Sequence, residues 1–342
     1  MPVRVAINGF GRTGRAAFRA AYERGAPIEW AAVNDVAGPE MIAQLLRHDT
    51  IYGPFPGTVE AEEDAIVVSG VRIPVPAEPD PAALPWDELD VDVVIESTGR
   101  FRKRPDAEKH VLAGAKRVIV SAPATDPDAT VVLGVNFDET FDPERHVIVS
   151  NASCTTNCLA PVAKVLHETV GIRHGQMTTV HAYTGDQMLL DGPHKDARRA
   201  RAAACNMVPT STGAAKAIGL VIPELEGRLK GFAVRVPVPT GSLVDLTVET
   251  IRPTTAEEVN EIFLERSDTG ALEGILRYSE EPLVSSDIVR SAYSSIFDAP
   301  LTTVVDGTQV KVLAWYDNEW GYSNRLVELA QRIAVPMLAG AF

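Results

Sequence analysis

The sequence predicts an α/β protein of two domains, a Rossmann-type doubly wound parallel sheet followed by an α+β domain with a mixed, mostly antiparallel sheet. Three observations lead to this prediction. The 342 residues suffice for two domains of ordinary size. In the first 150 residues, short Val- and Ile-rich runs alternate with helix-like stretches, as in parallel sheets with crossover helices. In the second half, strand-like segments follow one another with fewer helices between them, which favours antiparallel pairing.

In the first domain, runs that are apolar on both faces predict buried parallel strands. The predicted strands are residues 3–7, 28–33, 91–95, 117–120, 131–135 and 147–149, and the predicted helices are Gly14–Arg24, Pro39–Arg47 and Asp106–Ala115. One segment interrupts the alternation. Residues 58–59, 65–68 and 71–75, with Ser69-Gly70 between the last two, indicate an antiparallel excursion with a tight turn.

The second half is predicted to begin where the last parallel strand runs into Ser150-Asn151-Ala152-Ser153, so we expect the domain boundary near residues 150–153. A helix is expected from about Cys154 to Thr169 and another at residues 255–265. Strands are expected near residues 177–183, 231–238, 243–251, 303–306 and 309–316, and a final helix at about 322–334.

Composition narrows the classes of function. The net charge is −14, and this acidic balance disfavours nucleic acid and anionic membranes as partners. Three cysteines are too few for a disulfide framework and fit a reducing compartment. No apolar run approaches the length of a membrane span, and the N-terminus begins with a strand-like segment rather than a signal region. We therefore expect a soluble cytoplasmic protein.

A glycine-rich turn, Gly9-Phe10-Gly11-Arg12-Thr13-Gly14, follows the first predicted strand and opens the first predicted helix. In this context Gly9 permits a tight turn, Gly11 lets the backbone approach a pyrophosphate, and Gly14 allows close helix–strand packing. The N–H groups at the helix start favour phosphate. A flexible loop is the alternative, but the strand before and the helix after favour a dinucleotide site.

Asp35 lies 21 residues beyond Gly14, at the end of the second predicted strand. A carboxylate there binds the ribose 2′-hydroxyl and repels a 2′-phosphate, so the sequence favours NAD over NADP. The residues that follow, Val36-Ala37-Gly38, are small and leave room for a phosphate. Use of NADP therefore stays open.

Cys154 begins the helix that follows the last parallel strand. A thiolate in the first helical turn is stabilised by the helix dipole and by free N–H groups, so we expect a lowered pKa and a nucleophile. Cys158 lies one turn deeper and is expected in the core, and Cys205 is interpreted as structural. Burial as a small apolar residue and a Cys-x-x-x-Cys metal pair are the alternatives. No second Cys pair or His cluster accompanies these residues, so no metal is expected.

His181 is the candidate base, because it ends a segment, Met177 to Thr184, that alternates like a strand. A histidine on a half-buried strand is more often structural than catalytic. The Cys154 helix and the dinucleotide motif shift the balance toward catalysis.

Arginines and hydroxyls in the second half indicate an anion site. Arg198-Arg199-Ala200-Arg201, Arg235 and the run Thr210 to Lys216, which leads into a helix, supply guanidinium, hydroxyl and glycine backbone groups. Surface ion pairs and an ordinary helix cap are the alternative interpretation.

Beyond these motifs, the chain resembles the phosphorylating, glycolytic glyceraldehyde-3-phosphate dehydrogenase family over nearly its whole length. The resemblance is carried by Ala6–Arg12, Glu96–Gly99, Ser121–Pro123, Ser150–Pro161, Thr179–Thr184, Arg198–Ala204, Pro209–Lys216 and Trp315–Glu319. The run Ser-Asn-Ala-Ser-Cys-Thr-Thr-Asn-Cys is highly specific for this family and its near relatives.

The resemblance implies that Cys154 attacks the aldehyde while His181 takes the proton and stabilises the oxyanion. Hydride then passes to NAD, and inorganic phosphate cleaves the thioester to an acyl phosphate. It further implies binding roles for several residues. Thr184 and Arg235 would hold the substrate phosphate, and the attacking phosphate would be held by Ser153, Thr155, Arg199, Thr212 and Gly213. Asn318 would orient the nicotinamide carboxamide, and Tyr322 would pack beside that ring. Arg12 and Thr13 would contribute to the pyrophosphate turn, Thr98, Gly99 and Ser121 would line the cofactor groove, and Phe10 is also expected to bind the cofactor.

The resemblance also implies a homotetramer, in which the loop of about residues 183–206 reaches a neighbouring cofactor site. The final helix would pack on the first domain, so residues 1–152 and 319–342 would form the NAD-binding domain and residues 153–318 the catalytic domain. Thr13, Pro79, Gly185 and Gly192 depart from the usual family pattern. None of these positions is Cys154, His181, Arg199 or Arg235, so we expect activity to survive. Cofactor preference, inhibitor sensitivity and the direction of flux are the properties that these departures would affect.

Three alternatives remain at this point. Erythrose-4-phosphate dehydrogenase uses the same scaffold, but tends to alter the run Pro209 to Ala215 and Thr184, which are intact here. A specialised paralogue with dual NAD and NADP use is the second. A cofactor-binding regulator or scaffold without turnover is the third, although it would be expected to lack Cys154 or His181.

Overall fold

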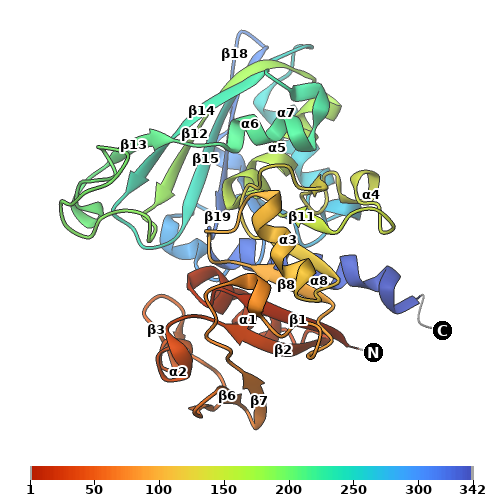
Figure 1. Cartoon of the computed structure of the whole chain (residues 1–342). Coiled ribbons are helices and arrows are strands. Elements are labelled where there is room, and N and C mark those ends of the chain that lie inside the picture. The colour runs from red at the N-terminus through yellow and green to blue at the C-terminus, as the bar shows by residue number, and fades with distance from the viewer. Residues whose placement is uncertain (1, 340–342) are drawn as a thin grey trace. The chain divides into compact units, whose positions relative to one another are not determined.

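The computed structural model describes residues 2–339, which fold into two compact units (Figure 1). Unit 1 consists of the described parts of Met1–Val131, Asp138–Ala152 and Ser323–Phe342, and unit 2 consists of Val132–Phe137 and Ser153–Tyr322. Within the described residues, no helix has both the length and the apolar character needed to cross a membrane.

Unit 1 contains the expected parallel sheet. Its strands are β1 (Val3–Asn8), β2 (Ile28–Asn34), β8 (Val93–Glu96), β9 (Arg117–Val120), β10 (Ala129–Thr130) and β11 (Ile148–Ser150), in the order β10-β11-β9-β8-β1-β2. The order reverses between β1 and β8, because the chain runs from β1 outward to β2 and then returns to the other side of β1. Ligands of such sheets bind at the carboxyl ends of the strands at this reversal. The doubly wound prediction is confirmed.

Helices α1 (Arg12–Glu23), α2 (Gly38–Arg47) and α3 (Arg104–Leu112) connect these strands close to their predicted positions. The α1 helix buries an alanine-rich face that includes Ala17 and Ala21. From Ser323 onward, helix α8 (Trp320–Ala339) belongs to the same unit, and its Val327 packs against Ala17 and Ala21. Arg24, at the end of α1, also donates a hydrogen bond to Asn324.

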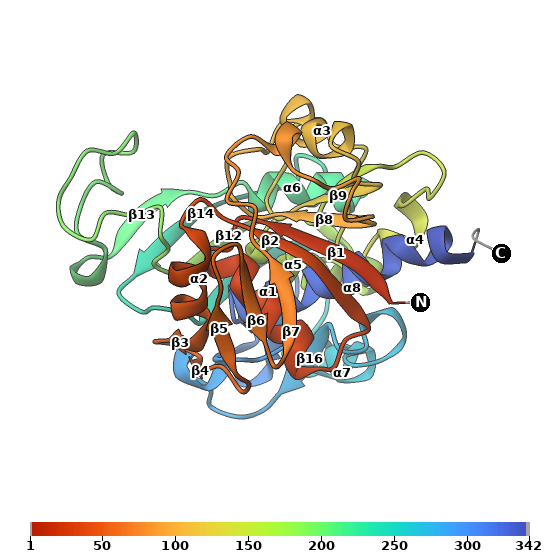
Figure 2. The ribbon, with the colours of Figure 1, turned by 60° about the horizontal axis from the view of Figure 1, so that its bottom comes forward.

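The antiparallel excursion is also present, as strands β5 (Val59–Ala61), β6 (Ala65–Val68) and β7 (Val71–Pro74) (Figure 2). Val68 pairs with Val71 across the two-residue turn Ser69-Gly70. Both turn residues have positive φ, 50° and 84°, which is the backbone conformation that a tight hairpin turn requires. Two short strands, β3 (His48–Asp49) and β4 (Gly53–Pro54), form a separate pair.

The prediction of a strand at residues 131–135 is wrong. These residues form a turn in which Asn136 accepts a hydrogen bond from Val132 N, and the short helix α4 (Phe137–Thr140) follows. Gly134 has φ 79°, and a Cβ there would lie 2.5 Å from the Ala271 carbonyl oxygen. This close approach explains why residues 132–137 belong to unit 2, whereas the sequence assigned them to the first domain. Residues 319–322 also fall in unit 2, where Arg290 lies over the Trp320 ring.

Unit 2 is built on an eight-stranded sheet, which is mixed and mostly antiparallel, as predicted. The strands are β12 (Ile172–Ala182), β13 (Val208–Ser211), β14 (Leu229–Val236), β15 (Ser242–Thr250), β16 (Leu276–Ser279), β17 (Ser295–Asp298), β18 (Thr303–Val305) and β19 (Gln309–Tyr316). Their order is β13-β14-β12-β15-β19-β17-β16, with β18 on β19. Only β12 with β14 and β16 with β17 pair in parallel among these strands. Strands β13, β16 and β17 were not predicted.

Three helices complete unit 2: α5 (Cys154–Thr169), α6 (Ala214–Val221) and α7 (Ala256–Arg266). The bounds of α5 are those expected from the sequence. Its first residue is fixed by Ser153, whose hydroxyl accepts a hydrogen bond from Thr156 N and caps the helix. The cap therefore places Cys154 in the first turn.

Candidate active site and cofactor pocket

Cys154 and His181 form the centre of the candidate active site in unit 2. Cys154 is partly buried at the start of α5, and His181 is buried near the end of β12. The Cys154 Sγ atom lies 3.6 Å from His181 Nε2. This is the distance of a sulfur–nitrogen hydrogen bond, so the imidazole is placed to exchange a proton with the thiol.

The other ring nitrogen of His181, Nδ1, has two polar neighbours. The Ala182 carbonyl oxygen lies 2.7 Å away, and Arg235 Nη1 lies 2.8 Å away. A carbonyl only accepts and a guanidinium only donates, so the tautomer of His181 decides which of them bonds to Nδ1. With the proton on Nδ1 and donated to Ala182, Nε2 keeps a lone pair toward the thiol.

Burial has the largest effect on the pKa values of Cys154 and His181. It raises the pKa of the Cys154 thiol, although the positive charge of Arg235 and hydrogen bonding with Thr155 act in the opposite direction. Burial, together with the Arg235 charge, lowers the pKa of His181 to about 3. The expectation of a lowered Cys154 pKa is therefore wrong, because loss of solvent outweighs the field at the helix start. At neutral pH the pair is a thiol beside a neutral imidazole.

Cys158 lies in the core, as the sequence predicted. It is fully buried, with its sulfur 3.6 Å from Ser295 Oγ and 3.7 Å from the Ala314 carbonyl oxygen. Burial raises its pKa far above the ordinary thiol range. Cys158 therefore stays a protonated core residue, whereas Cys205 is exposed.

Tyr316 is a neighbour of this pair that sequence reasoning missed. Its hydroxyl lies 2.8 Å from Thr155 Oγ1 and 2.9 Å from Thr179 Oγ1, and its ring meets His181 edge to face with centroids 5.9 Å apart. Burial raises the pKa of Tyr316 well above its ordinary value. The tyrosine is thus uncharged at neutral pH, held by two hydroxyl contacts, and packed against the imidazole ring. In the sequence, Tyr316 was visible only as a member of the run Trp315–Glu319 and as the end of a predicted strand, and neither indicated its contact with His181.

Arg235 is placed by strand register. The β12 and β14 strands are parallel neighbours, and His181 pairs directly with Arg235, so both side chains lie on the same face of the sheet. Arg235 Nη1 also donates to Thr184 Oγ1 at 3.1 Å, and its buried Nε has no hydrogen-bond partner in the described structure. A buried guanidinium with an unused donor is suited to bind an anionic ligand.

A second arginine, Arg199, lies in the same cluster. It pairs with Asp186, which also accepts a hydrogen bond from the Thr184 hydroxyl, and its Nε donates to Thr210 Oγ1 at 2.9 Å. Burial raises the pKa of Asp186, but Thr184 and the two arginines outweigh this effect, so the net shift is downward. Asp186 was not among the predicted site residues. It fixes the two predicted phosphate ligands Thr184 and Arg199 relative to each other.

The remaining predicted phosphate ligands lie at helix starts. Gly213 precedes the first residue of α6 and has no side-chain cap, and Thr212 Oγ1 accepts a hydrogen bond from Ala214 N at 3.2 Å. Ser153 caps α5. The Thr155 side chain is buried and its hydroxyl is bonded to Tyr316, an arrangement that the sequence did not indicate.

In unit 1, the glycine-rich turn lies at the carboxyl end of β1. Gly9 has φ 92°, and a Cβ there would lie 2.5 Å from Thr98 N. A Cβ at Gly14 would lie 2.3 Å from the Gly9 carbonyl oxygen, whereas one at Gly11 would meet nothing within 4 Å. No side chain caps α1 at Gly11. The turn therefore leaves open space at a helix start, which fits a bound pyrophosphate.

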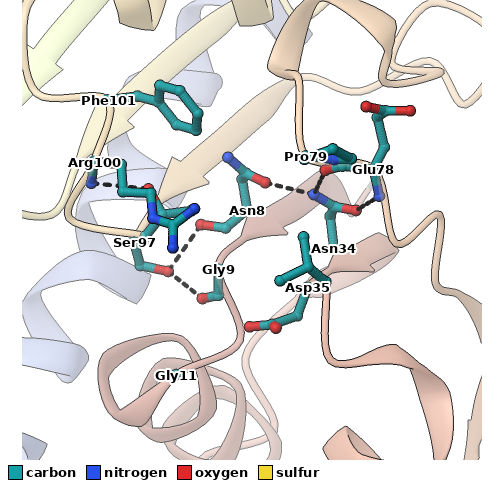
Figure 3. A pocket seen from close by; sticks show the side chains of 12 residues that line it. Asn8, Gly9, Gly11, Asn34, Asp35, Glu78, Pro79, Ser97, Arg100 and Phe101 are labelled. Atoms are coloured by element: carbon teal, nitrogen blue, oxygen red, sulfur yellow. Dashed lines mark hydrogen bonds between the residues drawn. The ribbon is translucent and has the colours of Figure 1, made fainter.

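Asp35 lies on the wall of a cavity of about 190 Å³ beside this turn. Its Oδ2 accepts a hydrogen bond from Phe10 N at 2.9 Å, and its Oδ1 accepts one from Ala37 N at 3.0 Å. Figure 3 shows Asn34, Asp35 and Pro79 on one side of the cavity and Ser97, Arg100 and Phe101 across from them. Two backbone donors thus fix the carboxylate that was predicted to bind the ribose.

The structure brings some of the other predicted cofactor ligands to this cavity. Thr98 lines it, and Gly99 follows with φ 70°. Arg12 and Thr13 form the first turn of α1, but the Arg12 side chain pairs with Asp49. Ser121 N donates to the Glu96 carbonyl oxygen at the end of the neighbouring strand.

Asn318 and Tyr322, the predicted nicotinamide ligands, belong to unit 2 and are both buried. Asn318 Oδ1 accepts a hydrogen bond from Ser242 Oγ at 2.9 Å. This contact fixes the orientation of the Asn318 amide. Across the described residues, no group of three or more His, Cys, Asp or Glu side chains is arranged to hold a metal ion.

Comparison with known proteins identifies both halves of the chain. Residues 3–104 match the NAD-binding domain of glyceraldehyde 3-phosphate dehydrogenase, and residues 153–318 match its C-terminal domain. Glyceraldehyde-3-phosphate dehydrogenase 1 of Streptomyces avermitilis is 62% identical over 330 residues, 96% of this chain and 98% of the relative. The Geobacillus stearothermophilus enzyme of that name is 57% identical, with 98% and 99% covered.

A third relative, glyceraldehyde-3-phosphate dehydrogenase 1 of Bacillus cereus, is 57% identical over 96% of this chain and 97% of its own length. Such identity over nearly the full length, with both domain models matched in order, agrees with the glycine-rich turn and the Cys154–His181 pair. The chain belongs to the glyceraldehyde-3-phosphate dehydrogenase family.

Proposed function

We propose that this chain is a phosphorylating glyceraldehyde-3-phosphate dehydrogenase. It oxidises D-glyceraldehyde 3-phosphate with NAD and inorganic phosphate to 1,3-bisphosphoglycerate through a thioester on Cys154. The observation that carries the proposal is the 3.6 Å contact between Cys154 Sγ and His181 Nε2, beside the unused Nε of Arg235. It joins a nucleophile, a base and an anion site on one face of unit 2.

In the first step Cys154 attacks the aldehyde carbon, and its proton moves to His181 Nε2. With its pKa lowered to about 3, the free imidazole is neutral at pH 7, and its Nε2 lies 3.6 Å from the thiol that gives up the proton. Once protonated, the imidazole donates a hydrogen bond to the oxyanion of the hemithioacetal, which stabilises it.

Bound NAD supplies a hydride acceptor that oxidises the hemithioacetal to a thioester. The Gly9–Gly14 turn would hold its pyrophosphate, and Asp35 its adenosine ribose. Thr98, Gly99 and Ser121 would line the groove, and Asn318 and Tyr322 would orient the nicotinamide. The open space at Gly11 and the fixed Asp35 carboxylate support this assignment.

Two phosphates have to be held in the complete reaction. Thr184 and Arg235 would bind the phosphate of the substrate. Ser153, Thr155, Arg199, Thr212 and Gly213 would bind the inorganic phosphate that cleaves the thioester. The proximity of Arg199 to Thr210, two residues before Thr212, supports the second group.

Phosphate dependence tests the proposed function against its nearest rival, erythrose-4-phosphate dehydrogenase. With glyceraldehyde 3-phosphate and NAD, omission of inorganic phosphate is expected to stop steady NADH formation, because the thioester is then not cleaved to the acyl phosphate. The measurement is NADH absorbance with each aldehyde, with and without phosphate. Equal rates without phosphate, or a clear preference for erythrose 4-phosphate, contradict the proposal.

The Asp35 carboxylate is expected to give NAD at least a tenfold higher kcat/KM than NADP, which corresponds to about 1.4 kcal/mol. The charge repels the 2′-phosphate. Asp35→Asn removes the charge and keeps an acceptor oxygen for only one of the Phe10 and Ala37 N–H groups. This variant is expected to bring the kcat/KM values for NAD and NADP closer together. Steady-state kinetics with both cofactors measure the ratio. A wild-type ratio near one would mean that the small residues after Asp35 decide cofactor choice.

We also propose a homotetramer that works in the cytoplasm. Leu189, Leu190 and Met207, on the segment between β12 and β13, are 81%, 76% and 75% exposed. Large apolar side chains gathered on one segment are typical of a surface covered by another subunit. The three cysteines are all unpaired, which suits a reducing compartment.

A further inference from the structure

Glu96 is a buried carboxylate at the carboxyl end of β8, where the strand order of the parallel sheet reverses. Its Oε2 accepts hydrogen bonds from Asn8 Nδ2 at 2.6 Å and from His110 Nε2 at 3.1 Å. Its Oε1 accepts them from the main-chain N–H of Thr98 at 2.9 Å and from the Thr98 hydroxyl. None of the functional roles assigned above uses Glu96.

In every hydrogen bond to the Glu96 side chain, Glu96 is the acceptor. Trp86 Nε1 can only donate, and it does so to His110 Nδ1 at 2.9 Å, which leaves His110 Nε2 as the donor toward Glu96. On the other side, Asn34 Nδ2 donates to Asn8 Oδ1 at 2.7 Å, and Asn8 donates to Glu96. A carboxylate is the one side-chain group that accepts on both oxygens, so only an acid completes this arrangement.

The chain of bonds reaches three separate walls of the cofactor cavity. Figure 3 shows the part of it that joins Asn8, Asn34 and Glu78. Asn8 ends β1 immediately before the glycine-rich turn. Thr98 lies in the loop after β8. Asn34 makes a double contact with the backbone of Glu78, donating to its carbonyl oxygen at 2.8 Å and accepting from its N–H at 2.9 Å. One buried carboxylate therefore connects the turn, the loop after β8 and the Glu78 segment.

We infer that Glu96 is a positioning residue that pre-organises the dinucleotide cavity of unit 1. It acts through Asn8, Thr98 and Asn34. The inference depends on one part of the proposed function, namely that this cavity binds NAD. Holding three walls in place before the ligand arrives lowers the cost of binding, so the effect belongs to NAD affinity rather than to the chemical step.

The test is Glu96→Gln in the full-length protein. Glutamine offers one oxygen and one NH₂ group, so either the Thr98 N–H or the Asn8 amide faces a donor and loses its acceptor. The Kd for NAD, measured by calorimetry without aldehyde, is expected to rise about tenfold or more. The KM for NAD is expected to rise with it, while kcat at saturating NAD and the KM for the aldehyde stay close to wild type.

Asp92→Asn is the matched control. Asp92 is a buried carboxylate just before the opposite end of β8, where it accepts a hydrogen bond from Arg4 N and pairs with Lys116. The Asp92→Asn substitution is expected to leave NAD affinity unchanged. If both variants lose NAD affinity equally, or if Glu96→Gln lowers kcat without raising the Kd for NAD, the inference is wrong.

A second variant keeps the inference testable if Glu96→Gln does not fold. Asn8→Ala preserves the Glu96–Thr98 bonds but breaks the link to Asn34, and it is expected to weaken NAD binding as well. Unchanged affinity in that variant would overturn the inference. Absence of NAD binding by the wild-type protein would overturn the proposed function instead, so the two failures are distinguishable.

Discussion

Replacing Cys154 by serine is expected to lower the rate of aldehyde oxidation by about 10³-fold or more while leaving NAD affinity unchanged. A serine hydroxyl is a far weaker nucleophile than a thiol, and it forms an ester rather than the thioester that phosphate cleaves. The cofactor cavity belongs to unit 1, and its lining includes no residue of α5. Initial rates of NADH formation and calorimetric NAD titration measure the two properties.

Cys205→Ser is the control for this substitution. Cys205 is exposed and lies in the 3-10 helix Ala203–Cys205, so loss of its thiol is expected to change neither rate nor affinity. If Cys154→Ser keeps the wild-type rate, the covalent mechanism is wrong. If it loses NAD affinity along with activity, the effect is a change of fold rather than loss of the nucleophile.

Replacing His181 by asparagine is expected to lower kcat by about 10²- to 10⁴-fold, the usual contribution of a positioned base. The pH profile should change as well. Burial holds the pKa of Cys154 above its ordinary value, so without an acceptor at 3.6 Å the thiol has to lose its proton to solvent. The rate of the variant is therefore expected to rise continuously between about pH 7 and 10 as the thiolate forms.

His174→Asn supplies the comparison on the same strand. His174 is exposed on β12, so its variant is expected to keep the wild-type rate and pH profile. A profile for His181→Asn that is parallel to that of the wild type would show that another group takes the thiol proton. Alkylation of Cys154 by iodoacetamide over the same pH range measures thiolate formation independently of turnover.

Features that depend on neighbouring residues were predictable from the sequence. The Gly9–Gly14 turn, the hairpin at Ser69-Gly70 and the start of α5 at Cys154 are each specified by a few consecutive residues. The structure contains all three. The parallel strands were also recognisable, because burial on both faces requires continuous apolar runs.

Features that depend on distant partners were not predictable. The residues 131–135 are apolar like a strand, but Gly134 lies against the Ala271 carbonyl oxygen and the segment turns instead. Asn8 and Glu96 are 88 residues apart, and no local pattern joins them. The pKa of Cys154 is a similar case. The helix start was visible in the sequence, whereas the burial that outweighs it depends on the folded unit.

The contribution of α8 to unit 1 has a consequence for the order in which the protein is made. Val327 completes a cluster with Ala17 and Ala21, and Arg24 bonds to Asn324, so the earliest and latest parts of the chain share one core. During synthesis, the core of unit 1 is therefore expected to stay incomplete until α8 has been translated, while unit 2 already has nearly all of its sequence. We therefore expect unit 1, most of which is translated first, to complete its core after unit 2.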